Sequence, residues 1–228
     1  NDEIDARTDL TDEEKAAAKS EAKAKADAAK AAIDKVTTNA EVDQVKTTGI
    51  TELKAVYPQP VAKSAAKQAI DEVLKAKTAE IDARIDLTDE EKAVANADAK
   101  AKADVAKEAI DRATTNAAVD QAKTNGTSEV TSVNPEAVAK TEAKKAIDDA
   151  LKAKTAEIDA RTDLTAEEKT AAKADAKATA DAAKAAIDKA TTNAEVDQSK
   201  STGIEEVNSV NPIAQIRPAV GASAGVHV

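Results

Sequence analysis

Apolar residues recur along the chain at the three- and four-residue steps of helices that pack along one seam. Between residues 22 and 36 the apolar positions are separated by four, three, four and three residues, and this spacing returns twice further on. Such a seam is typical of packed helical bundles. The three seams are Ala22, Ala26, Ala29, Ile33 and Val36; Ala99, Ala103, Ala106, Ile110 and Ala113; and Ala176, Ala180, Ala183, Ile187 and Ala190.

The seams belong to an internal 77-residue repeat. The string EIDAR begins at Glu3, Glu80 and Glu157, and single glycines stand at Gly49, Gly126 and Gly203. Self-similarity at a fixed period indicates tandem structural units. We therefore expect a partial repeat at 1–58 (the end of a first helix, then helices two and three), full three-helix repeats at 59–134 and 135–212, and a linker or tail at 213–228.

Capping residues predict where the second and third helices of each repeat begin. The second helix is expected to open with a capping box, in which a threonine hydroxyl and a glutamate three residues later bond each other's backbone N–H. These boxes are Thr11 with Glu14, Thr88 with Glu91, and Thr165 with Glu168. The third helix has the same signal at Thr38 with Glu41 and at Thr192 with Glu195, whereas Ala118 replaces the acid after Thr115.

The first helix is predicted to open at a proline. Asn134 is expected as its N-cap, with Pro135 at the first helical position, where a missing N–H costs nothing. The helix should then run to about Ala160. Together these signals predict breaks near residues 8–11, 37–39 and 56–60, and at the equivalent places in the two later repeats.

Two kinds of residue interrupt the helical pattern. A glycine inside a helix costs about 1 kcal/mol relative to alanine, so its recurrence at Gly49, Gly126 and Gly203 predicts a close helix approach, a kink or a break. Lys77 interrupts the apolar positions of a first helix that carries Ala66, Ile70 and Ile81. We expect its stem to cover apolar surface while its ammonium group stays in water.

The composition makes the predicted core thin and removes most catalytic chemistry. Alanine supplies 57 of the 228 residues, and cysteine, methionine, tryptophan and phenylalanine are absent. No disulfide, thiolate nucleophile, cysteine–histidine zinc site or row of stacking aromatic rings can be assembled. The few large aliphatic residues and the net charge of −10 would favour disorder, but the helical seams favour folded bundles.

Charge and hydropathy also limit the expected partners. Lysines have acidic neighbours rather than forming a basic stripe, so no nucleic-acid partner is expected. No apolar run approaches the roughly 18 residues of a membrane span, and we expect no membrane insertion of this chain and no signal peptide in it.

Carboxylate pairs are the remaining candidates for chemistry. Glu13 with Glu14, Asp148 with Asp149, and Glu205 with Glu206 could form an acid–base dyad or a calcium site, but solvated helix surface is the favoured interpretation. His227 is interpreted as a tail residue. We therefore predict no catalytic, cofactor-binding or metal-binding residue, no cofactor, and no enzymatic activity.

The recurring strings EIDAR, LT-x-EEK and TTNA-x-VDQ allow two interpretations. They could form a repeated ligand epitope, or they could determine the fold, since they lie where helices end and begin; the second is favoured. Tyr57, which stands where the other copies have asparagine, is interpreted as drift at a junction between repeats.

The motifs LT-x-EEK, AKA-x-A-x-x-AK-x-AID, ATTNA-x-VDQ-x-K-x-x-G and the closing V-x-P resemble a known repeat family over about residues 1–212. It comprises helical tandem repeats, catalogued as a domain of unknown function, in long cell-wall-anchored surface proteins of staphylococci, streptococci and lactobacilli. The resemblance implies an all-α, elongated rod of three-helix bundles outside the cell, at the cell wall.

The function implied by this resemblance is that of a stalk. It would project a distal adhesive domain in adhesion, aggregation or biofilm, with neighbouring repeats as partners and a host or matrix protein as the partner of the parent protein. One alternative is a helical module that itself binds a host or extracellular-matrix protein, although aromatic anchors for such binding are scarce. Another is a largely disordered desiccation-protective protein, in which shorter repeats are expected.

Overall fold

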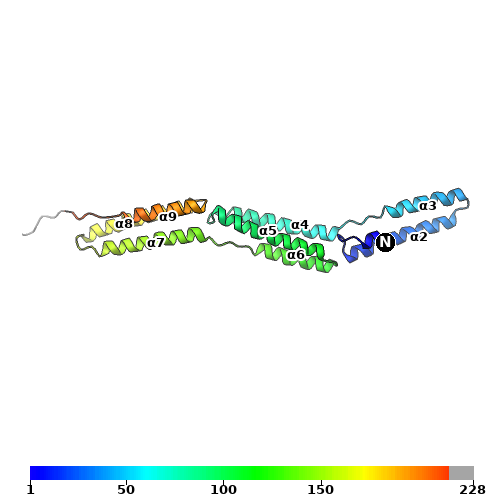
Figure 1. Cartoon of the computed structure of the whole chain (residues 1–228), viewed down its shortest axis with the longest axis horizontal. Helices are drawn as coiled ribbons and strands as arrows, with labels where there is room; N and C mark the ends of the chain where they lie inside the picture. The colour runs from blue at the N-terminus through cyan, green and yellow to red at the C-terminus, as the bar shows by residue number, and fades with distance from the viewer. Residues whose placement is uncertain (216–228) are drawn as a thin grey trace, which may run out of the picture. The chain divides into compact units, whose positions relative to one another are not determined.

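A computed structural model describes residues 1–215, which form nine α-helices and no strand (Figure 1). The all-α class and the tandem three-helix organisation are therefore confirmed. The observed gaps between helices coincide with the predicted breaks. Most of the predicted tail, with His227, lies outside the described residues. The helices are α1 (Asp2–Asp5), α2 (Asp12–Lys35), α3 (Asn39–Lys54), α4 (Val61–Asp82), α5 (Asp89–Arg112), α6 (Asn116–Thr131), α7 (Val138–Asp159), α8 (Ala166–Lys189) and α9 (Asn193–Asn208).

The chain divides into two compact units, and neither coincides with one repeat. The first unit combines Asn1–Asp82 with Ala95–Asn134, and the second combines Ala83–Val94 with the chain from Pro135 onward. Each unit thus joins parts of two consecutive repeats. The predicted elongated rod stays a prediction.

In the second unit, α7, α8 and α9 pack against one another in all three pairs. The core between them is built from the predicted seam of α8 and from residues of the two flanking helices. Half of its buried side chains are alanine, and the larger ones are Ile147, Ile187, Val196 and Val207. Burying isoleucine or valine contributes about 1.5–3 kcal/mol each, so these four carry most of the apolar stabilisation.

The first unit contains an equivalent bundle made of α4, α6 and the part of α5 that follows Ala95. Its core has the same positions one repeat earlier, with Ile70, Ile110, Val119 and Val130 as the large buried side chains. The seam alanines of α5, such as Ala99 and Ala103, are fully buried. The seam prediction is therefore confirmed in both complete bundles.

The recurrent glycines mark a close approach of helices, and no kink or break. Helix α9 runs without interruption through Gly203. A Cβ atom added at Gly203 would lie 2.5 Å from the Cβ of Ala183 and 2.8 Å from the Cδ1 of Ile147. Only glycine lets α8 and α7 come this near to α9. This close packing explains why glycine recurs here despite its cost in helix propensity.

In the first repeat, α2 and α3 pack as a pair, and the described residues before them form only the four-residue α1. Ile4 of α1 is buried with Leu10 and Ala18 at one end of this pair. No residue of α3 is buried.

Two predictions about helix starts were wrong. Asn134 and Pro135 do not open the first helix: α7 begins at Val138, its N-cap position is Ala137, and no side chain of the cap residue bonds the helix. The reason is a carboxylate from the preceding repeat, described below. At the third helix only half of the expected capping box forms, because Glu195 accepts a hydrogen bond from the Thr191 N–H, one residue before the N-cap.

The capping boxes predicted for the second helices are confirmed, and the prediction for Lys77 is confirmed in part. Full capping boxes form at Thr11, Thr88 and Thr165. Thr115 still accepts a hydrogen bond from the N–H of Ala118 despite the missing acid. The stem of Lys77 is buried as predicted, but its side chain is only 7 % exposed, and its ammonium group bonds the exposed Glu80 carboxylate at 2.9 Å instead of standing in water.

Candidate functional site at the repeat junction

The strings that recur once in each repeat gather where one repeat meets the next. In the second unit, the segment Ala83–Val94 of one repeat, which comprises the loop after α4 and the start of α5, lies against the bundle of the following repeat. It meets the start of α7, the end of α8 and the start of α9. The contacts there are mainly hydrogen bonds to backbone groups that helix ends leave without partners.

Lys140, in the first turn of α7, bonds two carbonyl oxygens from different segments. Its side chain is only 3 % exposed. The Nζ atom donates to the carbonyl of Ile85 at 2.9 Å and to that of Asp188 at 2.8 Å. Asp188 lies in the last turn of α8, where carbonyl groups have no partner within the helix. One buried ammonium group therefore joins the loop of one repeat to a helix end of the next.

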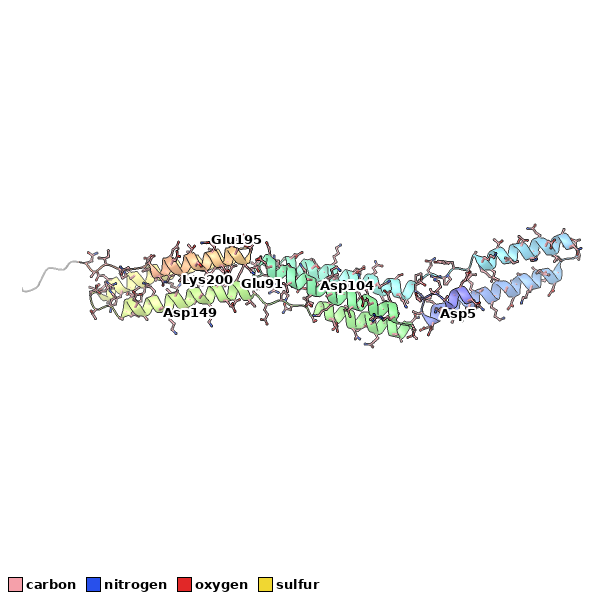
Figure 2. The ribbon with its side chains drawn as sticks, in the orientation of Figure 1. Asp5, Glu91, Asp104, Asp149, Glu195 and Lys200 are labelled. Atoms are coloured by element: carbon pink, nitrogen blue, oxygen red, sulfur yellow. The ribbon has the colours of Figure 1, made fainter. Side chains whose placement is uncertain are left out.

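Glu91 caps two helices at once. Its Oε1 atom accepts a hydrogen bond from the N–H of Thr88 at 2.9 Å, within its own capping box. Its Oε2 atom accepts from the N–H groups of Val138 at 3.0 Å and Ala139 at 3.1 Å, at the start of α7. Because Glu91 fills the capping position of α7, Asn134 is not needed there. Figure 2 shows Glu91 at the end of the bundle where Glu195 and Lys200 lie on α9.

The protonation of Glu91 depends on these contacts. Burial by itself would raise the pKa of its carboxyl group, but hydrogen bonds from the backbone of Thr88, Ala139 and Val138 and from the Thr88 hydroxyl outweigh it and lower the pKa below its ordinary value. The pKa of Glu14 is lowered for the same reasons, with Thr11 and Ala62 as donors.

Three further residues donate hydrogen bonds at this junction. The N–H of Asp89 donates to the carbonyl of Thr191 at 2.7 Å. The N–H of Asn193 donates to the Glu90 carboxylate at 3.0 Å. Arg84 bonds the Asp86 carboxylate through Nη2 and the carbonyl of Pro135 through Nη1, at 2.8 and 3.0 Å.

The first unit contains the same arrangement one repeat earlier. The Nζ atom of Lys63 donates to the carbonyls of Thr8 at 2.9 Å and Asp111 at 2.7 Å. Glu14 accepts from the N–H groups of Thr11 at 2.9 Å and Ala62 at 3.0 Å. The remaining equivalents are Asp12 N–H to the Thr114 carbonyl and Asn116 N–H to the Glu13 carboxylate.

One contact differs between the two junctions. The Arg7 guanidinium lies 4.5 Å from the centre of the Tyr57 ring, where Arg84 instead bonds a backbone carbonyl. The arginine therefore holds the segment between repeats in both places, by a cation–π contact in one and by a hydrogen bond in the other.

The same pattern begins again where the described residues end. Oε2 of Glu168 accepts a hydrogen bond from the N–H of Gln215 at 3.1 Å, the position equivalent to Val138. Val210 and Ala214 pack against the buried Ile158 and Leu164.

The other carboxylate pairs lie away from any enclosed site. Asp148 forms an ion pair with Lys184, while Asp149, Glu205 and Glu206 are exposed. Within residues 1–215 no group of three histidine, cysteine or acidic side chains is arranged to hold a metal ion. No helix in that range has both the length and the hydropathy of a membrane span.

Lys63, Lys140 and Glu90 are the junction residues that sequence reasoning missed, and Glu13 was interpreted as solvated surface although it accepts a hydrogen bond from the N–H of Asn116. A signal for the lysines was present, since each precedes a buried alanine by three residues and a buried isoleucine by seven, as in Lys140, Ala143 and Ile147. A lysine on the buried face of the first helix in both copies indicates a structural role for that lysine.

Comparison with known proteins identifies the repeat. A family profile described as Domain of Unknown Function (DUF1542) matches the chain three times, over residues 1–61, 62–138 and 139–215. Comparisons with curated proteins and with solved structures found no match.

Proposed function

Because the chain belongs to the family described as Domain of Unknown Function (DUF1542), we propose that it is a structural spacer, part of the stalk of a bacterial cell-surface protein. In this role the chain contributes length to the surface protein, and it performs no catalysis. The cell wall is the proposed location, with a distal adhesive domain carried outward in adhesion, aggregation or biofilm formation.

The hydrogen-bonded junction is the observation that supports this proposal. A flexible array would need only a linker between repeats, but here a buried lysine and a doubly capping glutamate connect them in both junctions. Contacts of this kind restrict bending, and a spacer must resist bending to hold a domain at a distance. The bundle helices of 22 to 24 residues would give each repeat a length of about 35 Å.

A binding module is the second candidate. It would use the exposed helix faces to hold a host or matrix protein. The residues that usually anchor such interfaces are scarce, since Tyr57 is the only aromatic ring of the Phe, Tyr and Trp classes in the sequence. We therefore favour the spacer.

Solution scattering on chains with two, three and four copies of the repeat tests the proposal. A spacer predicts that the maximum dimension grows by about 35 Å for each added repeat while the cross-sectional radius stays constant. A matched set with Lys63 and Lys140 both replaced by methionine should grow less steeply. A maximum dimension that grows as a compact particle or as a coil would contradict the spacer.

A further inference from the structure

Helix α6 carries a dipeptide that its equivalents lack. Asn125 directly precedes Gly126 there, and no other asparagine of the chain is followed by glycine. In the first and third repeats the position before the glycine is a threonine, Thr48 or Thr202. An asparagine before glycine is the most heat-labile kind, because glycine has no side chain to keep its main-chain nitrogen away from the neighbouring amide group. Asn125 is exposed, whereas Gly126 is buried.

The folded helix keeps this pair from reacting. Helix α6 runs without interruption through both residues, so the Gly126 N–H is directed at the carbonyl group four residues earlier. The Oδ1 atom of Asn125 accepts a hydrogen bond from Nε2 of Gln121 at 2.9 Å. An added Cβ atom on Gly126 would lie 2.4 Å from the Cβ of Ala106 and 2.9 Å from the Cδ1 of Ile70. The Gly126 nitrogen can therefore reach the asparagine side chain only when this part of α6 leaves the bundle.

Two contacts that hold α9 in place are missing from α6. In α9, Glu195 interacts favourably with the helix dipole, and it accepts hydrogen bonds from the N–H and the hydroxyl group of Thr191 at 3.3 and 3.2 Å. Ala118 stands at this position in α6, whose first turn has no acidic residue. Ile204 of α9 packs against the core of its bundle, and its equivalent in α6 is Thr127. Local opening therefore costs less free energy in α6 than in α9.

From these observations we propose that Asn125–Gly126 is a self-modification site, which converts an opening of α6 into a permanent covalent change of the second bundle. In the opened segment, the Gly126 nitrogen gives up its proton and bonds the Cγ atom of Asn125. The Cγ–Nδ2 bond breaks, and ammonia leaves with that proton. A water molecule then opens the succinimide ring, at Cγ to give aspartate or at the main-chain carbonyl carbon to give isoaspartate. No oxidant or reductant takes part.

Isoaspartate changes the main chain where α6 lies against Ala106 of α5 and Ile70 of α4. It adds one carbon atom to the main chain and one negative charge. The hydrogen bonds of the helix then lose their register across this point, and the second bundle does not close again around the modified segment. The third bundle contains no Asn–Gly pair and keeps its structure. The inference is independent of the spacer role.

Mass spectrometry of the whole chain, kept at neutral pH with and without guanidinium chloride, tests the proposal. Deamidation raises the mass by one dalton, and fragmentation locates the change and distinguishes isoaspartate from aspartate. In guanidinium chloride we expect Asn125 to be modified before any other asparagine. In the folded chain its modification should be at least about tenfold slower, because the rate follows the population of the opened helix. Asn125→Thr should remove the reaction.

A matched variant places the same pair in the better-held helix. The Asn–Gly pair made by Thr202→Asn in α9 should react as fast as that of α6 in guanidinium chloride. In the folded chain it should react about threefold to thirtyfold more slowly. Ala118→Glu combined with Thr127→Ile should slow the α6 site by a similar factor.

Amide hydrogen exchange reports the damage to the bundle. In the isolated isoaspartate form of the chain, the Gly126 amide should lose its protection against exchange. The Gly203 amide, in the third bundle, should exchange as slowly as in the unmodified chain.

Four results would overturn the proposal. Asn125 could stay unmodified in guanidinium chloride, which would show that the pair is not reactive. It could react equally fast in the folded and unfolded chains, which would show that the helix does not protect it. Equal folded-state rates in α6 and α9 would show that α6 opens no more readily. A protected Gly126 amide in the isoaspartate form would show that the bundle closes around the modified residue.

Discussion

At the scale of single residues, the junction depends on two side chains that take up backbone groups of neighbouring segments. Lys140 provides donors for two carbonyl oxygens, and Glu91 provides acceptors for three N–H groups. A buried backbone group without a partner costs about 1–3 kcal/mol. Each side chain therefore removes a penalty that several helix ends would otherwise impose.

Replacing Lys140 by methionine should lower the free energy of unfolding of the chain by about 2–3 kcal/mol. Methionine keeps an apolar stem of similar length but leaves the carbonyls of Ile85 and Asp188 without a donor. Urea denaturation followed by circular dichroism measures the change. Lys145→Met, on an exposed position of the same helix, is the control and should stay within about 0.5 kcal/mol. Equal effects of the two substitutions would show that the buried ammonium group is not needed.

Acid should weaken the folded state through Glu14 and Glu91. The pKa of each carboxyl group is lower in the folded than in the unfolded chain, so the stabilisation is complete above the unfolded value of about 4.3. It is lost as the pH falls through the folded pKa. We expect the urea midpoint of the native chain to fall below about pH 4.3 more steeply than that of the Glu14→Gln, Glu91→Gln double variant. Parallel pH curves for the two chains would contradict this assignment.

At the scale of the element, helix bounds and seams follow from local sequence, and the junction does not. The capping box at Thr165 and the alanine seam of α8 involve residues within a few turns of one another, so spacing alone identifies them. Glu91 and Val138 are 47 residues apart, and Glu90 and Asn193 are 103 apart. Asn134 has the local sequence signature of an N-cap. However, the N–H groups at the start of α7 are bonded by the Glu91 carboxylate, which only the tertiary structure brings near.

The glycine of the third helix gives a prediction that separates complete from incomplete bundles. Gly203→Ala should destabilise the third bundle by about 1–3 kcal/mol, because the added methyl group meets both Ala183 and Ile147. Gly49→Ala meets Ala29 alone, and the open side lets the pair adjust, so its gain in helix propensity of about 1 kcal/mol should offset most of the strain.

Thermal unfolding of both glycine variants measures this difference. The double variant Gly203→Ala, Ile147→Val removes the Cδ1 atom that the new methyl group would meet, and it should recover part of the loss. If Gly49→Ala is as destabilising as Gly203→Ala, contact between the second and third helices alone explains the glycine.

At the scale of the whole molecule, the spacer proposal predicts a narrow distribution of end-to-end distances. The chain contains no cysteine, so cysteines introduced at Ser20 and Ala178 provide unique sites for a pair of fluorescent labels. Lys63→Met combined with Lys140→Met should broaden the single-molecule distance distribution, because the junctions lose their buried ties. Pro135→Gly should have the smaller effect, since Pro135 does not begin the helix. A distribution already as broad as that of a coil in the native chain would refute the spacer.

The composition of the junction has a consequence for how such a gene can change. The second repeat carries both halves of the junction. Glu90 and Glu91, in the first turn of its second helix, accept hydrogen bonds from the following repeat. Lys63 in its first helix and the N–H group of Asn116 at the start of its third donate hydrogen bonds to the preceding repeat. Inserting or deleting one whole repeat by unequal recombination therefore recreates a matched pair of surfaces without any compensating substitution. The number of repeats can change between lineages while each junction keeps its hydrogen bonds. Selection can therefore act on the length of the array independently of its stability.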